Sequence, residues 1–84
     1  MNRKKLLAKV ASGSKNISFN EMVTLVETFG FRLVRVNGSH HIFVHPQIRE
    51  LVNLQEVNGK AKPYQIRQFL RLVELYDLKL GDYE

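Results

Sequence analysis

Apolar residues recur at helical spacing in two segments near the start of the chain, Arg3–Ala11 and residues 18–29. The second segment opens with Ser18 and Glu21, a pair that can form a capping box by satisfying free N–H groups of the first helical turn. It closes at Gly30, a residue type that often ends a helix in the left-handed conformation. We therefore predict a short helix at Arg3–Ala11 and a longer one at residues 18–29.

The pattern then changes to one typical of β-strands. Residues 31–36 and 39–45 are rich in branched and aromatic side chains, and Asn37-Gly38 between them is a strong hairpin signal. A two-residue turn at Asn37-Gly38 would place Arg35 opposite His40. One face of the hairpin would then carry Phe31, Leu33, Ile42 and Val44. The other face is also half apolar, so the pattern leaves open which face is buried.

The last third of the chain has the pattern of a strand, a polar loop and a helix. Residues 50–54 are expected to form a third strand, antiparallel to the second, and residues 56–62 a polar loop. Pro63 suits the first turn of a helix, and apolar residues then recur at helical spacing as far as Leu78. This order predicts one α+β domain, in which helices cover one face of a three-stranded antiparallel sheet.

Composition confines the chain to one small basic domain. Its 84 residues are 44% hydrophobic and 25% charged, with a formal net charge of +5 and a sequence pI near 9.8. The absence of cysteine excludes disulfides, thiolate zinc sites and cysteine nucleophiles. No apolar run approaches the roughly 18 residues that a membrane span requires. We therefore expect a cytoplasmic protein with no membrane contact and no cofactor.

The positive charge is concentrated in the first three quarters of the chain. Residues 1–62 hold ten basic and four acidic side chains, a net charge of +6, whereas residues 63–84 carry a net charge of −1. Such an excess favours a polyanionic partner, because each Lys or Arg that neutralises a phosphate releases condensed counterions. Many small basic proteins bind no polyanion, so composition alone does not decide for nucleic acid.

All the histidines of the chain fall within one short segment, at His40, His41 and His45. On a strand rising about 3.3 Å per residue, His41 and His45 would stand roughly 13 Å apart, while His40 and His41 would point to opposite faces. No carboxylate is close enough in the sequence to complete a ligand set. We therefore expect no metal site.

General acid–base chemistry is the stronger interpretation of these histidines, because imidazole exchanges protons near neutral pH. In RNA, a deprotonated 2′-hydroxyl can attack its own phosphodiester, so a histidine with a neighbouring cation could cut the strand without a metal. His40, with Arg35 predicted across the hairpin, fits these roles. Two alternatives stay open: His40 and His41 as polar residues of a half-exposed strand, or His and Arg that bind RNA without catalysis.

Further candidates for phosphate contacts lie in the hairpin turn and at the start of the last helix. Gly38 supports the turn, and Ser39 can hydrogen-bond to the turn or to a phosphate. Lys60, Lys62 and Arg67 flank a helix N-terminus, whose N–H groups can hold an anion. Solvated charge is the commoner explanation for such residues.

The residues around the predicted hairpin also carry a family resemblance. They are Gly30-Phe31, Arg35 and Gly38-Ser39-His40-His41-Ile42-Phe43. Together they resemble the HicA toxins of bacterial and archaeal HicAB toxin–antitoxin systems, over about residues 19–78. The resemblance implies a fold like the double-stranded-RNA-binding domain, in the order α-β-β-β-α. It also implies a metal-independent mRNA interferase, a HicB antitoxin that covers the active site, and a catalytic histidine directly after Gly-Ser, which here is His40.

The sequence departs from the short members of that family in two places. Residues 1–17 form an extra basic segment with the short first helix, ahead of a HicA-like domain at residues 18–80. Lys62-Pro63-Tyr64-Gln65 stands where the shorter members enter the last helix through Gly-Thr-Leu. The second change affects a possible phosphate-contacting helix start.

We therefore expect a HicA-type toxin: a cytoplasmic endoribonuclease that cleaves mRNA, inhibits translation and is held inactive by a HicB-like antitoxin. His40 is expected to act as general acid or base. The expected RNA contacts are Arg35, Gly38, Ser39, Lys60, Lys62 and Arg67. The alternative is a non-catalytic RNA-binding module of the same fold, and a third possibility is a module whose positive surface docks an acidic protein.

Overall fold

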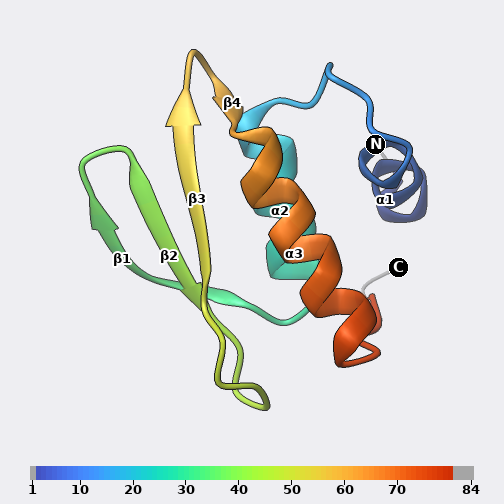
Figure 1. Cartoon of the computed structure of the whole chain (residues 1–84), viewed down its shortest axis with the longest axis vertical. Helices are drawn as coiled ribbons and strands as arrows, with labels where there is room; N and C mark the ends of the chain where they lie inside the picture. Colours follow the sequence, from blue (N-terminus) through green and yellow to red (C-terminus); the bar gives the residue numbers. More distant parts are fainter. Residues whose placement is uncertain (1, 81–84) are drawn as a thin grey trace.

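The computed structural model describes residues 2–80 and confirms the predicted α+β class. One antiparallel sheet has the strand order β1-β2-β3-β4, and the helices lie on one side of it (Figure 1). The elements, in chain order, are α1 (Arg3–Ala11), α2 (Phe19–Thr28), β1 (Arg32–Asn37), β2 (His40–Val44), β3 (Val52–Val57), β4 (Lys60–Ala61) and α3 (Pro63–Leu75). None of the helices within residues 2–80 is long and apolar enough to cross a membrane.

Helix α2 begins with the capping box that its sequence predicts. The Ser18 hydroxyl accepts a hydrogen bond from the Glu21 N–H at 3.0 Å, and the Glu21 carboxylate accepts one from the Ser18 N–H at 2.9 Å. The Ser18 N–H lowers the pKa of the Glu21 carboxyl, because it stabilises the charged form. The buried side of α2 carries Met22, Leu25 and Val26, and these three side chains are fully enclosed in the core.

Helix α1 packs on α2 and is part of the domain. Asn2 caps its first turn, and its Leu6 and Val10 side chains are buried in the core. Lys9 Nζ lies 3.9 Å from Glu21 Oε1, which is a further link between the two helices. The basic segment at the start of the chain therefore has an apolar side that α2 covers.

The first hairpin forms where the sequence predicts it, but its register differs. The turn begins at Gly38, which has a φ of +64°, and Asn37 stays in the strand and pairs with His40. Arg35 consequently pairs with Ile42. The predicted pairing of Arg35 with His40 is therefore wrong. A two-residue loop that opens with glycine at positive φ matches the twist of the strands, which favours this register.

A β-bulge in β1 changes which of its residues share a face. The register shifts between Leu33 and Arg35, which leaves Val34 as the extra residue. In a regular strand Arg32 and Arg35, three positions apart, would point to opposite faces. The bulge instead places both arginines on the same face, because their partners in β2 are two positions apart.

Strands β2 and β3 show which face of the sheet is buried, a question that the sequence left open. Phe43 and Leu54 point to the helices and are fully buried. Ile42 and Asn53, which pair with each other, lie on the opposite face. We call this second face, which points away from the helices, the outer face.

Strand β1 forms an uncovered edge of the sheet. All its residues are exposed, and the large aliphatic side chains among them are Leu33, Val34 and Val36. Along its free side, the backbone groups of β1 pair with no other strand of residues 2–80.

A fourth strand forms within residues 56–62, which the sequence pattern predicted as a polar loop. Asn58 and Gly59 make a tight turn with φ values of 53° and 78°, and β4 pairs with the end of β3. Positive φ at both turn positions is the geometry that Asn-Gly favours in hairpins. The predicted three-stranded sheet is thus corrected to four strands. The third strand also begins later than predicted, at Val52.

Because β4 is short, β3 donates a further backbone hydrogen bond to a side chain of α3. Gln65 is buried, and its Oε1 accepts a hydrogen bond from the Gln55 N–H at 2.7 Å. The Gln65 side chain thereby replaces a strand partner that β4 does not reach. Helix α3 itself ends at Leu75, earlier than predicted, and Leu78 packs on the core beyond it.

Candidate active site

His40 begins β2 and lies on the outer face of the sheet. It pairs with Asn37 of β1 and with Gln55 of β3, and directly opposed residues share a face. The side chain is half-buried, so the ring is not enclosed in the core. A ligand laid across the outer face can therefore reach it.

Asn53 of β3 orients the His40 ring. Its Oδ1 lies 3.3 Å from His40 Nδ1. An amide oxygen only accepts hydrogen bonds, so this contact requires the proton on Nδ1 and leaves the Nε2 lone pair of the neutral ring available. Among residues 2–80, no group hydrogen-bonds to His40 Nε2. This is the arrangement of a general base that can receive a proton from a substrate.

Arg32 and Arg35 bring two guanidinium groups to the same face. Arg35 pairs with Ile42, two positions along β2 from His40, and is therefore a diagonal neighbour of His40. Arg32 lies further along the strand, opposite Val44. Both arginines are exposed, and neither forms a salt bridge with any residue in the range 2–80. Guanidinium groups in this state suit phosphate oxygens, which they bind as a fork.

The hairpin turn next to His40 is tied to β3. Gly38 adopts a positive φ, which residues with a side chain rarely do. The Ser39 carbonyl accepts hydrogen bonds from the Glu56 N–H at 3.0 Å and from His41 Nδ1 at 3.1 Å. These bonds give Gly38 and Ser39 a role in shaping the site. Their contacts with RNA stay a prediction.

The other two histidines pack on aromatic residues. His41 points to the helices, and its ring lies on Phe19 with 4.7 Å between the centroids. His45 lies against Phe31 with 5.0 Å between the centroids, and its Nδ1 accepts a hydrogen bond from the Gln47 N–H. Within residues 2–80, no group of His, Asp and Glu side chains is arranged to hold a metal ion.

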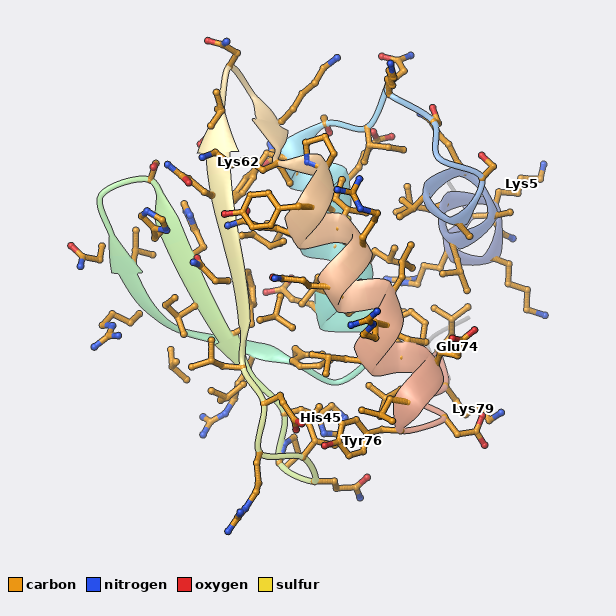
Figure 2. The ribbon with its side chains drawn as sticks, viewed as in Figure 1. Lys5, His45, Lys62, Glu74, Tyr76 and Lys79 are labelled. Atoms are coloured by element: carbon orange, nitrogen blue, oxygen red, sulfur yellow. The ribbon has the colours of Figure 1, made fainter. Side chains whose placement is uncertain are left out.

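Lys60, Lys62 and Arg67 line a groove between the end of α1, β4 and the start of α3. His40 is not among the residues that line it. Figure 2 shows Lys62 at the start of α3 and Tyr76 at the other end of that helix. Of the residues predicted to contact RNA, Arg35, Gly38 and Ser39 belong to the hairpin that carries His40, and the other three line the groove. The RNA contacts of those three stay a prediction.

Sequence reasoning did not select Arg32 or Asn53. Asn53 stands between Val52 and Leu54, and a polar residue between two apolar ones already indicates a side chain that points outward. Its contact with His40 depends on the register of β2 and β3, which the alternation of residues does not fix. Arg32 joins this face only through the bulge.

The outer face combines a proton acceptor with positive charge. Imidazole Nε2 can take a proton from a hydroxyl, and guanidinium groups can stabilise the negative charge that develops on a phosphate. The paired positions of β1, β2 and β3 on this face hold no carboxylate. The arrangement suits chemistry at a phosphate ester that uses a base and cations.

The segment that matches a known protein family includes the whole sheet. A family model described as the HicA toxin of bacterial toxin–antitoxin systems matches residues 19–75. This confirms the resemblance that the hairpin residues carry, and the matched segment contains His40, Arg35 and Asn53, whereas α1 precedes it. A comparison with curated proteins gave no match. The chain belongs to the HicA family of toxins from bacterial toxin–antitoxin systems.

Proposed function

We propose that this toxin cleaves mRNA in the cytoplasm, with His40 as the general base. Membership of the family gives the toxin role and, with it, an antitoxin partner. The observation that carries the proposed cleavage is the position of His40. Its ring lies on the outer face with Nε2 available, and two guanidinium groups share that face.

The proposed reaction uses the ribose 2′-hydroxyl beside the phosphate that is cleaved. His40 Nε2 accepts the hydroxyl proton, O2′ bonds to phosphorus, and the P–O5′ bond breaks. The products are a 2′,3′-cyclic phosphate and a 5′-hydroxyl, whose oxygen receives a proton from water. Because DNA lacks the 2′-hydroxyl, it is not a substrate in this scheme. A proton transfer of this kind contributes roughly 10²- to 10⁴-fold to the rate.

The two arginines act on the charge of the phosphate. Arg35, the diagonal neighbour of His40, is placed to bind a non-bridging oxygen as negative charge develops, and Arg32 extends the positive surface along the strand. Gly38 and Ser39 shape the turn beside the reacting group. The paired positions of β1, β2 and β3 on the outer face hold no carboxylate, so the proposed reaction uses His and Arg.

An antitoxin of the HicB type would inhibit this reaction by covering the outer face. Strand β1 supports this part of the proposal, because its aliphatic side chains are exposed beside the site. Exposed apolar side chains on an edge strand favour contact with another protein. The proposed reaction uses no group of Lys60, Lys62 or Arg67, which line a groove that does not include His40.

The test compares His40→Ala with the unchanged protein. Purified protein is incubated with a single-stranded RNA and with the DNA of the same sequence, in the presence of EDTA. We expect cleavage of RNA only, and a loss of about 100-fold or more in His40→Ala. Circular dichroism and RNA binding should be unchanged. Arg49→Ala, which removes an exposed charge from the loop after β2, is the control.

Two results would decide against the proposal. Cleavage by His40→Ala at the normal rate would show that the imidazole is not the base. RNA binding without cleavage by the unchanged protein, with growth arrest that His40→Ala retains in a bacterial host, would identify a non-catalytic RNA-binding module instead.

A further inference from the structure

A groove of about 710 Å³ lies between the segment after α1, strand β4 and the start of α3. Its lining comes from three segments, residues 10–17, 57–63 and 66–70. The first of these precedes residues 19–75, the segment that matches the family. The groove therefore depends on the N-terminal extension, which α2 holds in place through Leu6 and Val10.

The floor of the groove is aliphatic. Ile17 is buried beneath it, and Ile66 and Leu70 of α3 are half-buried along it. Val57, at the end of β3, adds an exposed aliphatic side chain. No aromatic residue is among the lining residues.

The rim of the groove is positive. It carries Lys15, Lys60, Lys62 and Arg67, and no acidic side chain lines the groove. None of these four cations forms a salt bridge within the described part of the chain, residues 2–80. Lys60 Nζ instead donates to the Lys15 carbonyl at 3.1 Å, which holds it at the edge of the groove.

The start of α3 adds to the positive potential. Lys62 occupies its N-cap position without a capping side-chain hydrogen bond, and the first turn contains no acidic residue. The N-terminal end of a helix carries partial positive charge from its aligned peptide dipoles. The helix thus reinforces the four side-chain charges, and the groove as a whole complements negative charge above an apolar floor.

We infer that this groove binds an acidic amphipathic segment of a partner protein. Aliphatic side chains of that segment would cover the floor, and its carboxylates would meet the cations of the rim. RNA fits the groove less well, because an aliphatic floor has no partner in a phosphate backbone, whereas aliphatic side chains of a peptide would cover it. His40, Asn53 and Arg35 are not among the lining residues, so the inference does not depend on the proposed cleavage.

The test uses the full chain and a fluorescein-labelled twelve-residue peptide with Leu on one helical face and Glu on the other. We expect amide NMR shifts confined to residues 10–17 and 57–70. The double variant Lys62→Glu/Arg67→Glu should weaken binding by about tenfold or more, as measured by fluorescence anisotropy. The matched control is Lys4→Glu/Arg49→Glu, which reverses two exposed charges outside the groove and should change the affinity less than twofold.

Additional probes distinguish the class of ligand. A peptide with Ser in place of Leu should bind much more weakly, and His40→Ala should bind the original peptide normally. Equal affinity for the Ser peptide, equal binding by both double variants, or no binding at millimolar peptide would overturn the inference. A twelve-nucleotide single-stranded RNA that shifts the same amides and displaces the peptide would overturn it too, and would show that the groove is an RNA surface.

Discussion

His40 and Asn53 meet across β2 and β3, with 3.3 Å between Nδ1 of the ring and Oδ1 of the amide. They are diagonal neighbours, since His40 pairs with Gln55 and Asn53 pairs with Ile42. Strand β3 thus holds the His40 ring through Asn53. The same strand holds the turn, because the Glu56 N–H donates a hydrogen bond to the Ser39 carbonyl. The orientation of the proposed base is therefore a property of the register between the two strands.

Replacing Asn53 should lower activity without removing RNA binding. Asn53→Leu deletes the acceptor for the Nδ1 proton, so the ring loses its preference for the tautomer with Nε2 available. We expect kcat to fall by roughly 10- to 100-fold, by analogy with the loss on removing the hydrogen-bond partner that orients a metal-bound histidine. KM for RNA should change little. Asn53→Asp keeps an acceptor oxygen and should retain the tautomer.

The tautomer can be measured directly from the imidazole ¹⁵N shifts of His40. A merely structural role of Asn53 would lower kcat in both variants through loss of folded protein, with the same ¹⁵N pattern in each. If His40→Ala is inactive but Asn53→Leu keeps full kcat and the Nδ1–H tautomer, Asn53 is not a positioning residue and the proposed function still stands.

The bulge at Val34 predicts opposite outcomes for two single-residue deletions. Deleting Val34 removes the extra residue and leaves Arg32 and Arg35 on the outer face, so RNA cleavage should fall by less than about threefold. Deleting Val36 also restores regular pairing, but it turns Arg35 to the helix side. That variant should lose most of its cleavage activity, because a cation leaves the phosphate site.

Both deletions shorten the same exposed strand, so thermal unfolding serves as the control for stability. A similar melting temperature in the two variants, together with different activity, would confirm the assignment of Arg35 to the outer face. Equal activity in the two variants would show that Arg35 does not contribute from that face.

Gly30, which follows α2, should tolerate a side chain less well than Gly13, which follows α1. A Cβ at Gly30 would lie 3.0 Å from His45 Nε2, whereas a Cβ at Gly13 would meet nothing within 4 Å. Both glycines have positive φ, 97° and 82°. We expect Gly13→Ala to cost about 1 kcal/mol of unfolding free energy from backbone strain, and Gly30→Ala about 2 to 3 kcal/mol.

Urea unfolding of the two variants measures this difference. In Gly30→Ala, an added His45→Ala change should recover part of the loss, because the His45 ring is the group that the new Cβ meets. Identical losses at the two glycines would mean that strain alone acts at Gly30.

The capping box predicts a pH dependence of stability. The Ser18 N–H lowers the pKa of the Glu21 carboxyl in the folded state, so the unfolded chain binds more protons in the acid range. The stability that Glu21 contributes is therefore present above the pKa of its carboxyl in the unfolded chain. It is lost as the pH falls through the pKa of that carboxyl in the folded protein. The free energy of unfolding, measured with urea, should therefore fall less between neutral and acidic pH in Glu21→Gln than in the unchanged protein. An equal fall in the two proteins would contradict the prediction.

Local signals were sufficient for the helices and for the existence of the first hairpin. The Ser18 and Glu21 pair, Pro63 and the apolar spacing all act within one or two helical turns, and each helix formed where these signals lie. The last helix was predicted too long, because Leu78 packs on the core without being helical. An apolar residue at helical spacing indicates burial but does not by itself extend a helix.

The register of the sheet could not be obtained in this way. Shifting the turn by one residue separates Arg35 from His40, and the bulge then returns Arg35 to the same face. Both events depend on packing between strands, which single-strand alternation does not contain. The short β4 was different, because Asn58-Gly59 is the same signal that predicted the first hairpin and could have been used.

The open edge of β1 has a consequence for the isolated protein in solution. Two copies that meet along this edge could continue the sheet, and Leu33, Val34 and Val36 would gain burial in doing so. Arg32 and Arg35 oppose such self-association, because each copy brings the same charges to the junction. Salt screens repulsion between charges more than about 8 Å apart at physiological ionic strength, and this distance shortens as salt is added. Solubility of the free toxin is therefore expected to fall as ionic strength rises.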